Sequence, residues 1–403
     1  MKKLWLPSAL ALAVAALTLA PAPAEDAAKK DAQATADALA KKLVTQCARV
    51  KGGDIVQISG GVRDAALLES LAVETAKLGA DPLLILSPGD RTARRLFTDV
   101  PAKYDSRSSP ATQKLAETVT VAIGVDATES EATLADIPPE RMHARAEAGI
   151  KVMDTLLKRN VRQIYVGNGL YPTEARAKQY GVTREELAKL FHDGLNVDYD
   201  KLQATGEAVR QALAAGKKVH VTTPEGTDLT VEVAGRPVFV SDGVLSDEKV
   251  KRGGAACQAW LPAGEVYVTP VAGTAEGRVA LERMLWEGKE VQGLTLTFKK
   301  GKLTEMKAKS GLDRLQAVYE AAGPGKDEFG ALDVGINPAV RLPKNSPAGL
   351  FMEAGTITIA VGGNVWAGGD NKSPFAIMCF LRGGTLSADD KALIQDGALQ
   401  PPR

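Results

Sequence analysis

Between Ala36 and about Gly216, short apolar runs rich in β-branched residues alternate with helix-length amphipathic segments. The runs predicted as strands are Ile55–Ser59, Leu83–Ser87, Val119–Ile123 and Gln163–Val166. Segments such as Asp64–Leu78 and Pro139–Arg159 join them as helices. Repeated strand-helix-strand units build a parallel sheet covered by helices on both faces. The pattern therefore predicts an α/β domain with a doubly wound parallel sheet over residues 36–216.

From about Lys217 the pattern changes to alternating runs separated by turn residues. Pro224–Gly226 and Lys300–Gly301 are hairpin-type turns between such runs. A helix over Tyr199–Ala215, followed by Gly216, marks the break between the two patterns. We therefore expect a second α+β domain over residues 217–403, built on mixed or antiparallel sheet.

The first residues resemble an export signal. Lys2 and Lys3 precede an apolar run over residues 4–20, and Ala22–Ala24 offers an A-x-A cleavage site. The run is shorter than the ~20 residues of a membrane span. We expect a signal peptide over residues 1–24, a polar leader over 25–35 and a periplasmic or secreted chain without membrane attachment.

The composition indicates a folded protein with no affinity for nucleic acid. Of its 403 residues, 45% are hydrophobic and 25% charged, which is typical of globular domains. Without Lys2 and Lys3 the chain carries 48 basic and 49 acidic residues, so the net charge is near −1. Nothing in this balance favours nucleic acid as a partner.

Common catalytic and nucleotide-binding motifs are absent from the sequence. The turn at Ser59–Asp64 lacks the G-x-G-x-x-G of dinucleotide sites, and there is no G-x-S-x-G or H-E-x-x-H. We interpret the histidines as structural, and Cys257 has no identifiable histidine partner. Cys47 is expected on the buried face of a helix. The sequence does not decide whether two of the three cysteines form a disulfide. The histidines are His143, His192 and His220.

Carboxylates remain as candidates for chemistry. Glu265 follows a Pro/Gly turn at the start of a strand, Asp333 lies in a short run before Gly335–Pro338, and Glu353 precedes another strand. Three carboxylates brought together hold Ca²⁺ or Mg²⁺, which prefer oxygen ligands. Scattered loop acids are more often solvated, so this pattern alone does not predict a metal site.

Several segments resemble the thermophilic metallo-aminopeptidases of the aminopeptidase T and aminopeptidase S group. They include KGGDIVQIS, the Tyr171–Glu174 segment, TPEGTDLTVEVAGR, LPAGEVYVTPVAGTAEGRV, Gly335–Pro338 and the closing GGTLSADDKALIQDGAL. The resemblance covers about residues 36–399. It implies a homodimer whose C-terminal domain holds two divalent ions that activate water for peptide hydrolysis. It also places the first metal-binding glutamate at Glu265.

The other metal-ligand positions of that family are substituted in this chain. They fall on Ala331, Thr358, Val365, Ala376 and Met378. Alanine, valine and methionine supply no hard donor, and a threonine hydroxyl is a weak one. The two-metal centre of Zn, Co, Mn or Mg is therefore not expected to assemble, and we expect no cofactor.

Three functions remain open. The first is a non-catalytic homologue, a pseudoenzyme that binds a peptide or small molecule or acts as a scaffold. The second is an active aminopeptidase with a rebuilt single-cation site around Glu265 and Asp333, assisted by Glu353 or Asp370. The third, a ring-cleaving dioxygenase on the same scaffold, needs histidine and carboxylate iron ligands that the chain lacks.

Overall fold

The parallel sheet predicted for the first half of the chain is present in the computed structural model, which describes residues 33–400. Its strands lie in the order β2-β1-β3-β4-β8, and all neighbours are parallel. Their bounds are β1 (Ile55–Gly60), β2 (Asp81–Leu86), β3 (Val121–Val125), β4 (Arg162–Val166) and β8 (Gln258–Leu261). The four predicted strands are confirmed.

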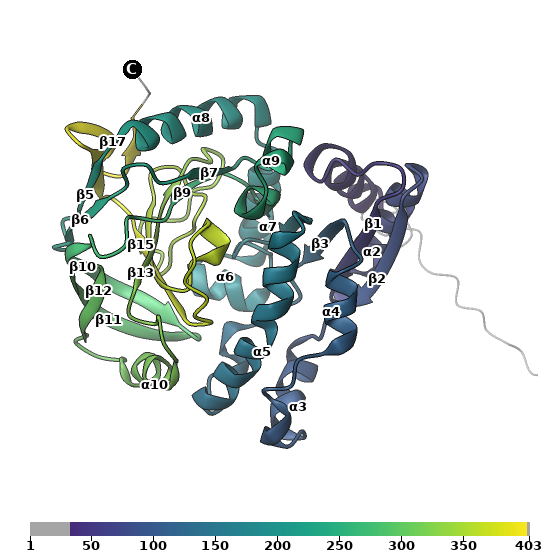
Figure 1. The fold of residues 1–403 in the computed structure, drawn as a ribbon, viewed down its shortest axis with the longest axis horizontal. Coiled ribbons are helices and arrows are strands. Elements are labelled where there is room, and N and C mark those ends of the chain that lie inside the picture. The colour runs from purple at the N-terminus through teal and green to yellow at the C-terminus, as the bar shows by residue number, and fades with distance from the viewer. Residues whose placement is uncertain (1–32, 401–403) are drawn as a thin grey trace, which may run out of the picture.

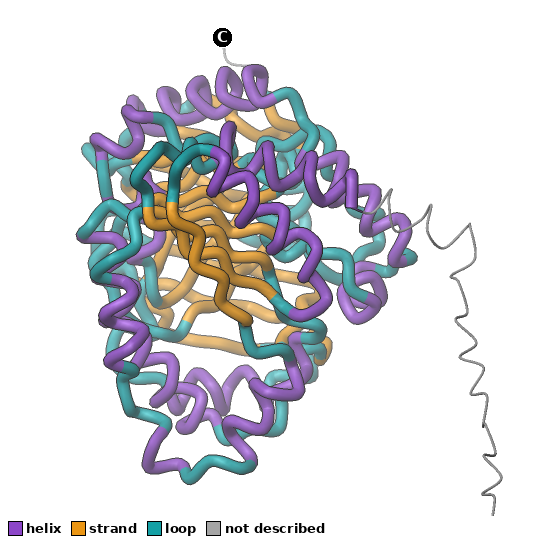
Figure 2. Tube along the Cα trace, turned by 90° about the vertical axis from the view of Figure 1, so that its right-hand side faces the viewer, coloured by secondary structure: helices purple, strands orange, loops and turns teal. Residues whose placement is uncertain are grey.

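Helices flank this sheet on both sides, as Figures 1 and 2 show. They include α2 (Ala65–Lys77), α3 (Asp90–Thr98), α4 (Pro110–Ala116), α5 (Pro139–Lys158), α6 (Glu174–Tyr180) and α7 (Arg184–Leu195). The next helix, α8 (Tyr199–Ala215), packs instead against strands of the second half of the chain. α8 begins where the Asp198 side chain accepts a hydrogen bond from the Lys201 N–H. It ends at the predicted residue, before Gly216.

The second half of the chain forms two antiparallel sheets. The larger has the order β12-β11-β10-β6-β5-β16-β17-β18, and the smaller has β15-β14-β13-β9-β7. Two helices accompany them, α9 (Asp247–Arg252) and α10 (Asp313–Ala321). The strands are β5 (Lys218–Thr222), β6 (Asp228–Glu232), β7 (Val238–Ser241), β9 (Glu265–Val268), β10 (Glu276–Trp286), β11 (Lys289–Lys299), β12 (Lys302–Lys307), β13 (Phe329–Gly335), β14 (Ile357–Gly362), β15 (Ala376–Leu381), β16 (Thr385–Ala388), β17 (Lys391–Gln395) and β18 (Ala398–Leu399).

Both predicted hairpins are confirmed. β5 pairs with β6 across the turn that contains Pro224–Gly226, and β11 pairs with β12 across Lys300 and Gly301. Lys300 and Gly301 have φ of 50° and 74°, which is the left-handed backbone that a two-residue hairpin turn requires. The α/β fold with an antiparallel second part is therefore the one that the sequence predicts.

The strand β8 links the two parts. Although it lies beyond residue 216, it pairs with β4 at the edge of the parallel sheet. The predicted boundary between 36–216 and 217–403 therefore does not coincide with the limit of that sheet. Four residues after the end of β8, the chain returns to the smaller antiparallel sheet at Glu265. This path places Glu265 at the junction of the two parts.

The N-terminal end of the described chain is helical from residue 33 and continues into a π-helical turn at Lys42–Cys47. Leu43, Val44 and Cys47 are buried there, so the predicted burial of Cys47 is confirmed. The predicted signal peptide over residues 1–24 and most of the leader over 25–35 lie outside the described residues. Within residues 33–400, no helix has the length and apolar character needed to cross a bilayer.

Candidate functional site

One face of the smaller antiparallel sheet brings the predicted site residues together. Asp333 on β13 lies opposite Tyr267 on β9 and opposite Thr358 on β14. Glu265 lies opposite Gly335, two residues along β13 from Asp333. Because side chains alternate along a strand, Glu265, Tyr267 and Asp333 point to the same face.

The substituted ligand positions continue this face across the sheet. Ala331 lies opposite Ala360, and Ala360 lies opposite Met378 on β15. Ala376 is two residues before Met378 and therefore shares its face. Val365 is outside the sheet, in the short 3₁₀ turn Val365–Ala367 that follows β14.

Aromatic side chains fill the space over this face. Tyr267 is fully buried and its ring centroid lies 5.6 Å from that of Trp260 and 5.4 Å from that of Trp366. Phe239 stacks on Tyr267 at 5.7 Å. Ala331 packs in the same cluster. The small residue at a predicted ligand position is thus accommodated by large rings from elsewhere in the chain.

Glu265 is a buried carboxyl held from one side. It is 2% exposed, and its Oε1 accepts a hydrogen bond of 2.5 Å from the Asn168 side-chain amide. Burial raises the pKa of Glu265 to about 8, against the smaller opposing effect of the Asn168 hydrogen bond. A carboxyl in this setting is favoured in its neutral form.

Asp333 is a buried carboxyl without a partner. It is 2% exposed, and neither of its carboxyl oxygens has a hydrogen bond in the described chain. The hydroxyl of Thr358, directly opposite, also lacks a partner there. Burial, and then the charge of Glu265, raise the pKa of Asp333 well above its usual value. Buried polar atoms without a partner require a proton, a water or a cation to explain them.

Neither acid predicted to assist Glu265 and Asp333 is available to them. Glu353 is buried, but it forms an ion pair of 3.1 Å with Arg382. Asp370 is exposed on the surface. Across residues 33–400 no three His, Cys, Asp or Glu side chains are grouped so as to hold a metal ion. Two carboxyls, one hydroxyl and a packed aromatic cluster do not fit a dinuclear centre, which needs several charged or imidazole ligands.

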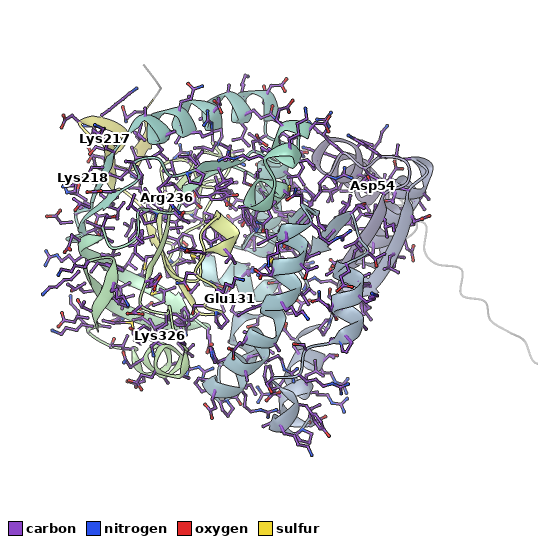
Figure 3. The ribbon with its side chains drawn as sticks, viewed as in Figure 1. Asp54, Glu131, Lys217, Lys218, Arg236 and Lys326 are labelled. Atoms are coloured by element: carbon purple, nitrogen blue, oxygen red, sulfur yellow. The ribbon has the colours of Figure 1, made fainter. Side chains whose placement is uncertain are left out.

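A cleft of about 700 Å³ lies beside this face, between the parallel sheet and the antiparallel part. Asn168 and Tyr180 line it on one side, and Trp286 and Met378 on the other. Glu131, labelled in Figure 3, is an exposed acid on its border. Most of the wall is apolar, as in sites that bind small organic molecules or peptide side chains.

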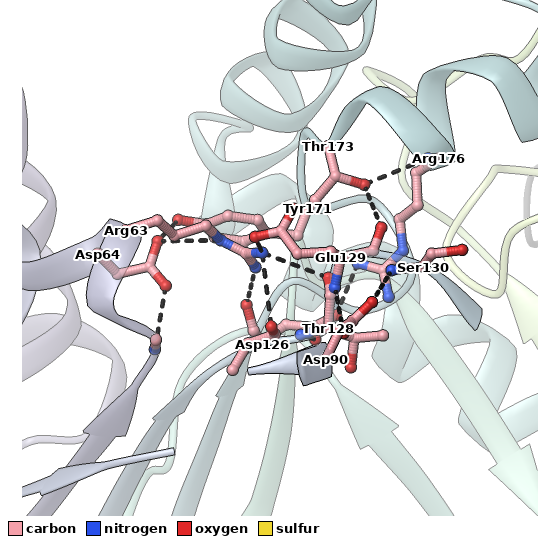
Figure 4. Close-up of polar contacts among 12 residues, drawn as sticks. Arg63, Asp64, Asp90, Asp126, Thr128, Glu129, Ser130, Tyr171, Thr173 and Arg176 are labelled. Carbon is pink, nitrogen blue, oxygen red and sulfur yellow. Dashed lines mark hydrogen bonds and ion pairs between the residues drawn. The ribbon is translucent and has the colours of Figure 1, made fainter. Parts of the chain in front are cut away.

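The carboxyl edge of the parallel sheet is occupied by a polar network (Figure 4). The Asp64 carboxylate accepts a hydrogen bond of 3.2 Å from the Gly61 N–H and another from the Tyr171 hydroxyl. Arg63 forms an ion pair with Glu129. A carboxylate therefore occupies the turn after β1 where a nucleotide phosphate would lie in a dinucleotide-binding fold, consistent with the missing glycine motif.

The histidines and cysteines are structural in this arrangement. His220 contacts the Asp228 carboxylate at 2.8 Å on the surface, His143 lies 4.0 Å from Glu147, and His192 packs on Phe191. All three cysteines lie in the described chain as buried free thiols, so the disulfide left open by the sequence is not formed. The cysteines are Cys47, Cys257 and Cys379.

Sequence analysis missed the residues that complete the site. Asn168, which holds Glu265, has a φ of 44°, and it lies between two glycines directly after β4. A polar residue in such a Gly-Asn-Gly turn at a strand end is a usable signal of a functional loop. Tyr267 alternates with Glu265 on one strand and could have been placed beside it. Trp260 and Trp366 carried no local signal.

Comparison with known proteins gives a family match, one curated relative and similar solved structures. The family described as "Thermophilic metalloprotease (M29)" matches residues 32–366. Aminopeptidase AmpS of Bacillus subtilis (strain 168) is 31% identical over 97 residues, which is 24% of this chain and 22% of that protein. The chain thus spans about a fifth of the curated relative that it matches.

Two solved structures share the fold. Wild-type AmpT from Thermus thermophilus has a TM-score of 0.67 at 17% identity, over 92% of this chain and all of that one. The 2,5-dihydroxypyridine dioxygenase from Pseudomonas putida KT2440 has a TM-score of 0.60 at 15% identity, over 92% and 98%. At these identities the likeness shows the fold alone. Since the family model covers most of the chain, the protein belongs to the M29 family of thermophilic metalloproteases.

Proposed function

We propose that this protein is a non-catalytic member of its metal-dependent family, which uses the cleft beside the former metal site to bind a peptide or a small organic ligand. The observation that carries the proposal is the aromatic cluster of Trp260, Tyr267 and Trp366. It packs over the face where the family resemblance places metal ligands and where this chain has mostly alanine, threonine and methionine. An ion at this face would have to displace packed rings, and alanine, valine and methionine would give it no hard donor.

The cleft supports a binding role. Its volume of about 700 Å³ is within the range of small-molecule sites, and its mainly apolar wall suits an apolar side chain or ring. Trp286 and Met378 offer flat and adaptable apolar contacts, while Asn168 offers a directional polar group. An organic ligand with an apolar body and one polar end fits this combination.

The cellular setting follows from the sequence. The predicted signal peptide over residues 1–24 implies a periplasmic or secreted protein, free of the membrane once the signal is removed. The net charge near −1 gives no attraction to nucleic acid. The family resemblance implies a homodimer.

The second candidate function is an active aminopeptidase with a rebuilt site. The observation in its favour is the set of unpartnered oxygens on Asp333 and Thr358 beside Glu265. Two carboxylates and a hydroxyl are ligands for one hard cation such as Mg²⁺ or Ca²⁺. The two candidates therefore differ in metal content.

The deciding experiment is elemental mass spectrometry on the protein purified without a metal-chelating tag. Bound metal is measured before and after soaking in zinc, cobalt, manganese, magnesium and calcium, together with release of N-terminal residues from a peptide series. No stoichiometric metal and no release support the binding function. Metal that is lost in Glu265→Gln, with release in the wild type, would establish the second candidate instead.

Ligand binding is tested in parallel with the same peptides by calorimetry. Ala376→Phe places a ring in the cleft, and Ala204→Phe places one on the exposed face of α8 outside it as the matched control. We expect affinity to fall at least about tenfold in Ala376→Phe, equivalent to about 1.4 kcal/mol, and to stay unchanged in the control. Equal affinities in both variants would locate binding elsewhere.

A further inference from the structure

A second cavity, separate from the cleft, opens between loops of the antiparallel part. It has a volume of about 420 Å³ and shares no lining residue with the cleft. Its wall is formed by the turn after β6, the loop after β9, the turn between β11 and β12, the start of β13 and the loop after β14. Polar atoms form a larger share of this wall than of the cleft wall. Cavities of this size bind small organic molecules.

Opposite charges line this cavity without pairing. Two basic and two acidic side chains of the wall have no ion-pair partner in residues 33–400. The basic ones are Arg236 and Lys300, and the acidic ones are Glu328 and Asp370. A further lysine of the wall, Lys302, is paired at 3.6 Å with Asp327, which does not line the cavity. The unpaired charges of the wall therefore balance.

Arg236, labelled in Figure 3, is the best-fixed charge of this wall. It is partly buried, its Nε donates to the Thr269 carbonyl at 2.9 Å, and its Nη2 donates to the Thr269 hydroxyl at 2.6 Å. Because Thr269 is neutral, these bonds orient the guanidinium but do not compensate its charge. Both hydrogens of Nη1 remain without an acceptor in the described chain. A guanidinium held in this way favours a carboxylate, with which it forms charge-assisted hydrogen bonds.

The two acids lie on segments that are hydrogen-bonded to each other. The Glu328 carbonyl accepts a hydrogen bond of 2.7 Å from the Gly362 N–H, and the loop that carries Asp370 follows Gly362. Both carboxylates are exposed, and neither has a hydrogen bond or an ion pair in the part of the chain that the structure describes. Asp370 was expected to assist Glu265, but it lines this cavity instead. The two carboxylates are acceptors for an ammonium group.

We propose that this cavity binds a small zwitterion, a free α-amino acid, with its carboxylate at Arg236 and its ammonium group at Glu328 and Asp370. A simple anion would be attracted to Arg236 but would also meet two carboxylates, and a simple cation would meet Arg236 and Lys300. A zwitterion satisfies both sets of charges. Val271 adds apolar surface to the same wall for a short side chain. The site is independent of the cleft and of the function proposed for it.

Three small molecules separate the two charges of the ligand. Alanine, propionate and ethylamine share a short apolar body, and at neutral pH only alanine carries both charges. Saturation-transfer NMR on the purified protein measures the dissociation constant of each. We expect alanine to bind with a dissociation constant on the order of 1 mM, and at least about tenfold more tightly than either of the others. Equal binding of propionate, or no binding of alanine, would overturn the proposal.

Substitutions in the wall test the two ends of the ligand. Arg236→Gln should weaken alanine binding at least about tenfold. Arg107→Gln, at an exposed arginine that lines neither cavity, is the matched control and should leave alanine binding unchanged. Glu328→Gln combined with Asp370→Asn removes two exposed charges that bond nothing else, so folding should be unaffected. This double variant should bind alanine no more tightly than propionate; if it still prefers alanine, the acids do not hold the ammonium group and the proposal fails.

Ala376→Phe, which fills the cleft, distinguishes the two cavities. It should leave alanine binding unchanged. Loss of alanine binding in Ala376→Phe but not in Arg236→Gln would place the ligand in the cleft and overturn the proposal. Thermal melting shows whether Arg236→Gln is folded; if it is not, the double variant of Glu328 and Asp370 decides alone.

Discussion

Replacement of Asp333 by asparagine separates a metal-free site from a cation site. The Asp333 carboxyl is 2% exposed, and both its oxygens lack a partner in the described chain. Asparagine has nearly the same shape but no charge and no proton to take up. The Thr358 hydroxyl lies directly opposite and is free to accept one amide hydrogen. If no cation is present, the substitution should stabilise the protein.

The expected magnitude follows from the cost of burying the acid. At pH 7 a carboxyl with an ordinary pKa near 3.9 takes up a proton at a cost of about 4 kcal/mol, at 1.36 kcal/mol per pH unit. Burial of an asparagine amide with incomplete hydrogen bonding costs about 1–2 kcal/mol, which offsets part of this gain in stability. We therefore expect Asp333→Asn to raise the free energy of unfolding by about 2 kcal/mol at pH 7.

The gain should depend on pH with a definite sign. Burial raises the pKa of Asp333, so between about pH 4 and the folded-state value the folded chain holds a proton that the unfolded chain has released. The wild type therefore loses stability as the pH rises through this range, and Asp333→Asn does not. At pH 5 the cost of protonation is only about 1.5 kcal/mol, so the two proteins should be nearly equal.

Urea denaturation with a chelator at pH 5 and pH 7 measures both values. Asp390→Asn, at an exposed acid in the turn between β16 and β17, is the matched control and should change neither. The reasoning is refuted if Asp333→Asn is less stable than the wild type at pH 7. A loss that grows when divalent cation replaces the chelator would show that Asp333 is a ligand.

Three further predictions concern the scaffold. The Asp54 carboxylate, labelled in Figure 3, is partly buried, which alone would raise its pKa, but hydrogen bonds from the Lys51 N–H, the Thr120 hydroxyl and, at 2.6 Å, Arg162 outweigh this and lower the pKa. Asp54→Asn should therefore cost about 2 kcal/mol in urea denaturation, and the wild-type contribution should be lost as the pH falls below about 4. Gly301→Ala should cost at least about 1 kcal/mol in the same assay, because Gly301 has a φ of 74° and a Cβ there would lie 2.6 Å from a backbone nitrogen. The native thiols should resist a colorimetric thiol reagent until urea unfolds the chain, since burial raises the pKa of each of them, Cys47, Cys257 and Cys379.

Much of the fold was predictable because its signals are local. The runs at β1 to β4 are bounded by turn residues and separated by helix-length segments, and the hairpin turns carry Pro-Glu-Gly and Lys-Gly. β8 was not predictable. Its four residues join the parallel sheet only after the chain has formed three strands of the antiparallel part. No adjacent strand-helix-strand unit in the sequence therefore indicates that β8 pairs with β4.

The candidate site was likewise predictable only in part. Ala331 and Asp333 are two residues apart in one predicted extended run, so alternation puts their side chains on one face, and the register of β13 agrees. The aromatic packing over that face could not be predicted from the sequence. Trp260 comes from a strand of the other sheet, and Trp366 comes from a loop after β14. The contact between these two rings depends on packing between segments about 100 residues apart, and the hydrophobic pattern of the sequence does not predict such contacts.

Retention of Glu265 needs a physical reason if no metal binds there. A neutral Glu265 still accepts a hydrogen bond from the Asn168 amide, which also donates to the Pro262 carbonyl at 3.1 Å. Asn168 has left-handed backbone, which costs free energy unless its surroundings fix it. With both amide hydrogens directed at the sheet, its carbonyl oxygen is left for the cleft that it lines. On the proposed function, Glu265 has thus changed from a metal ligand into a residue that positions Asn168 for a ligand.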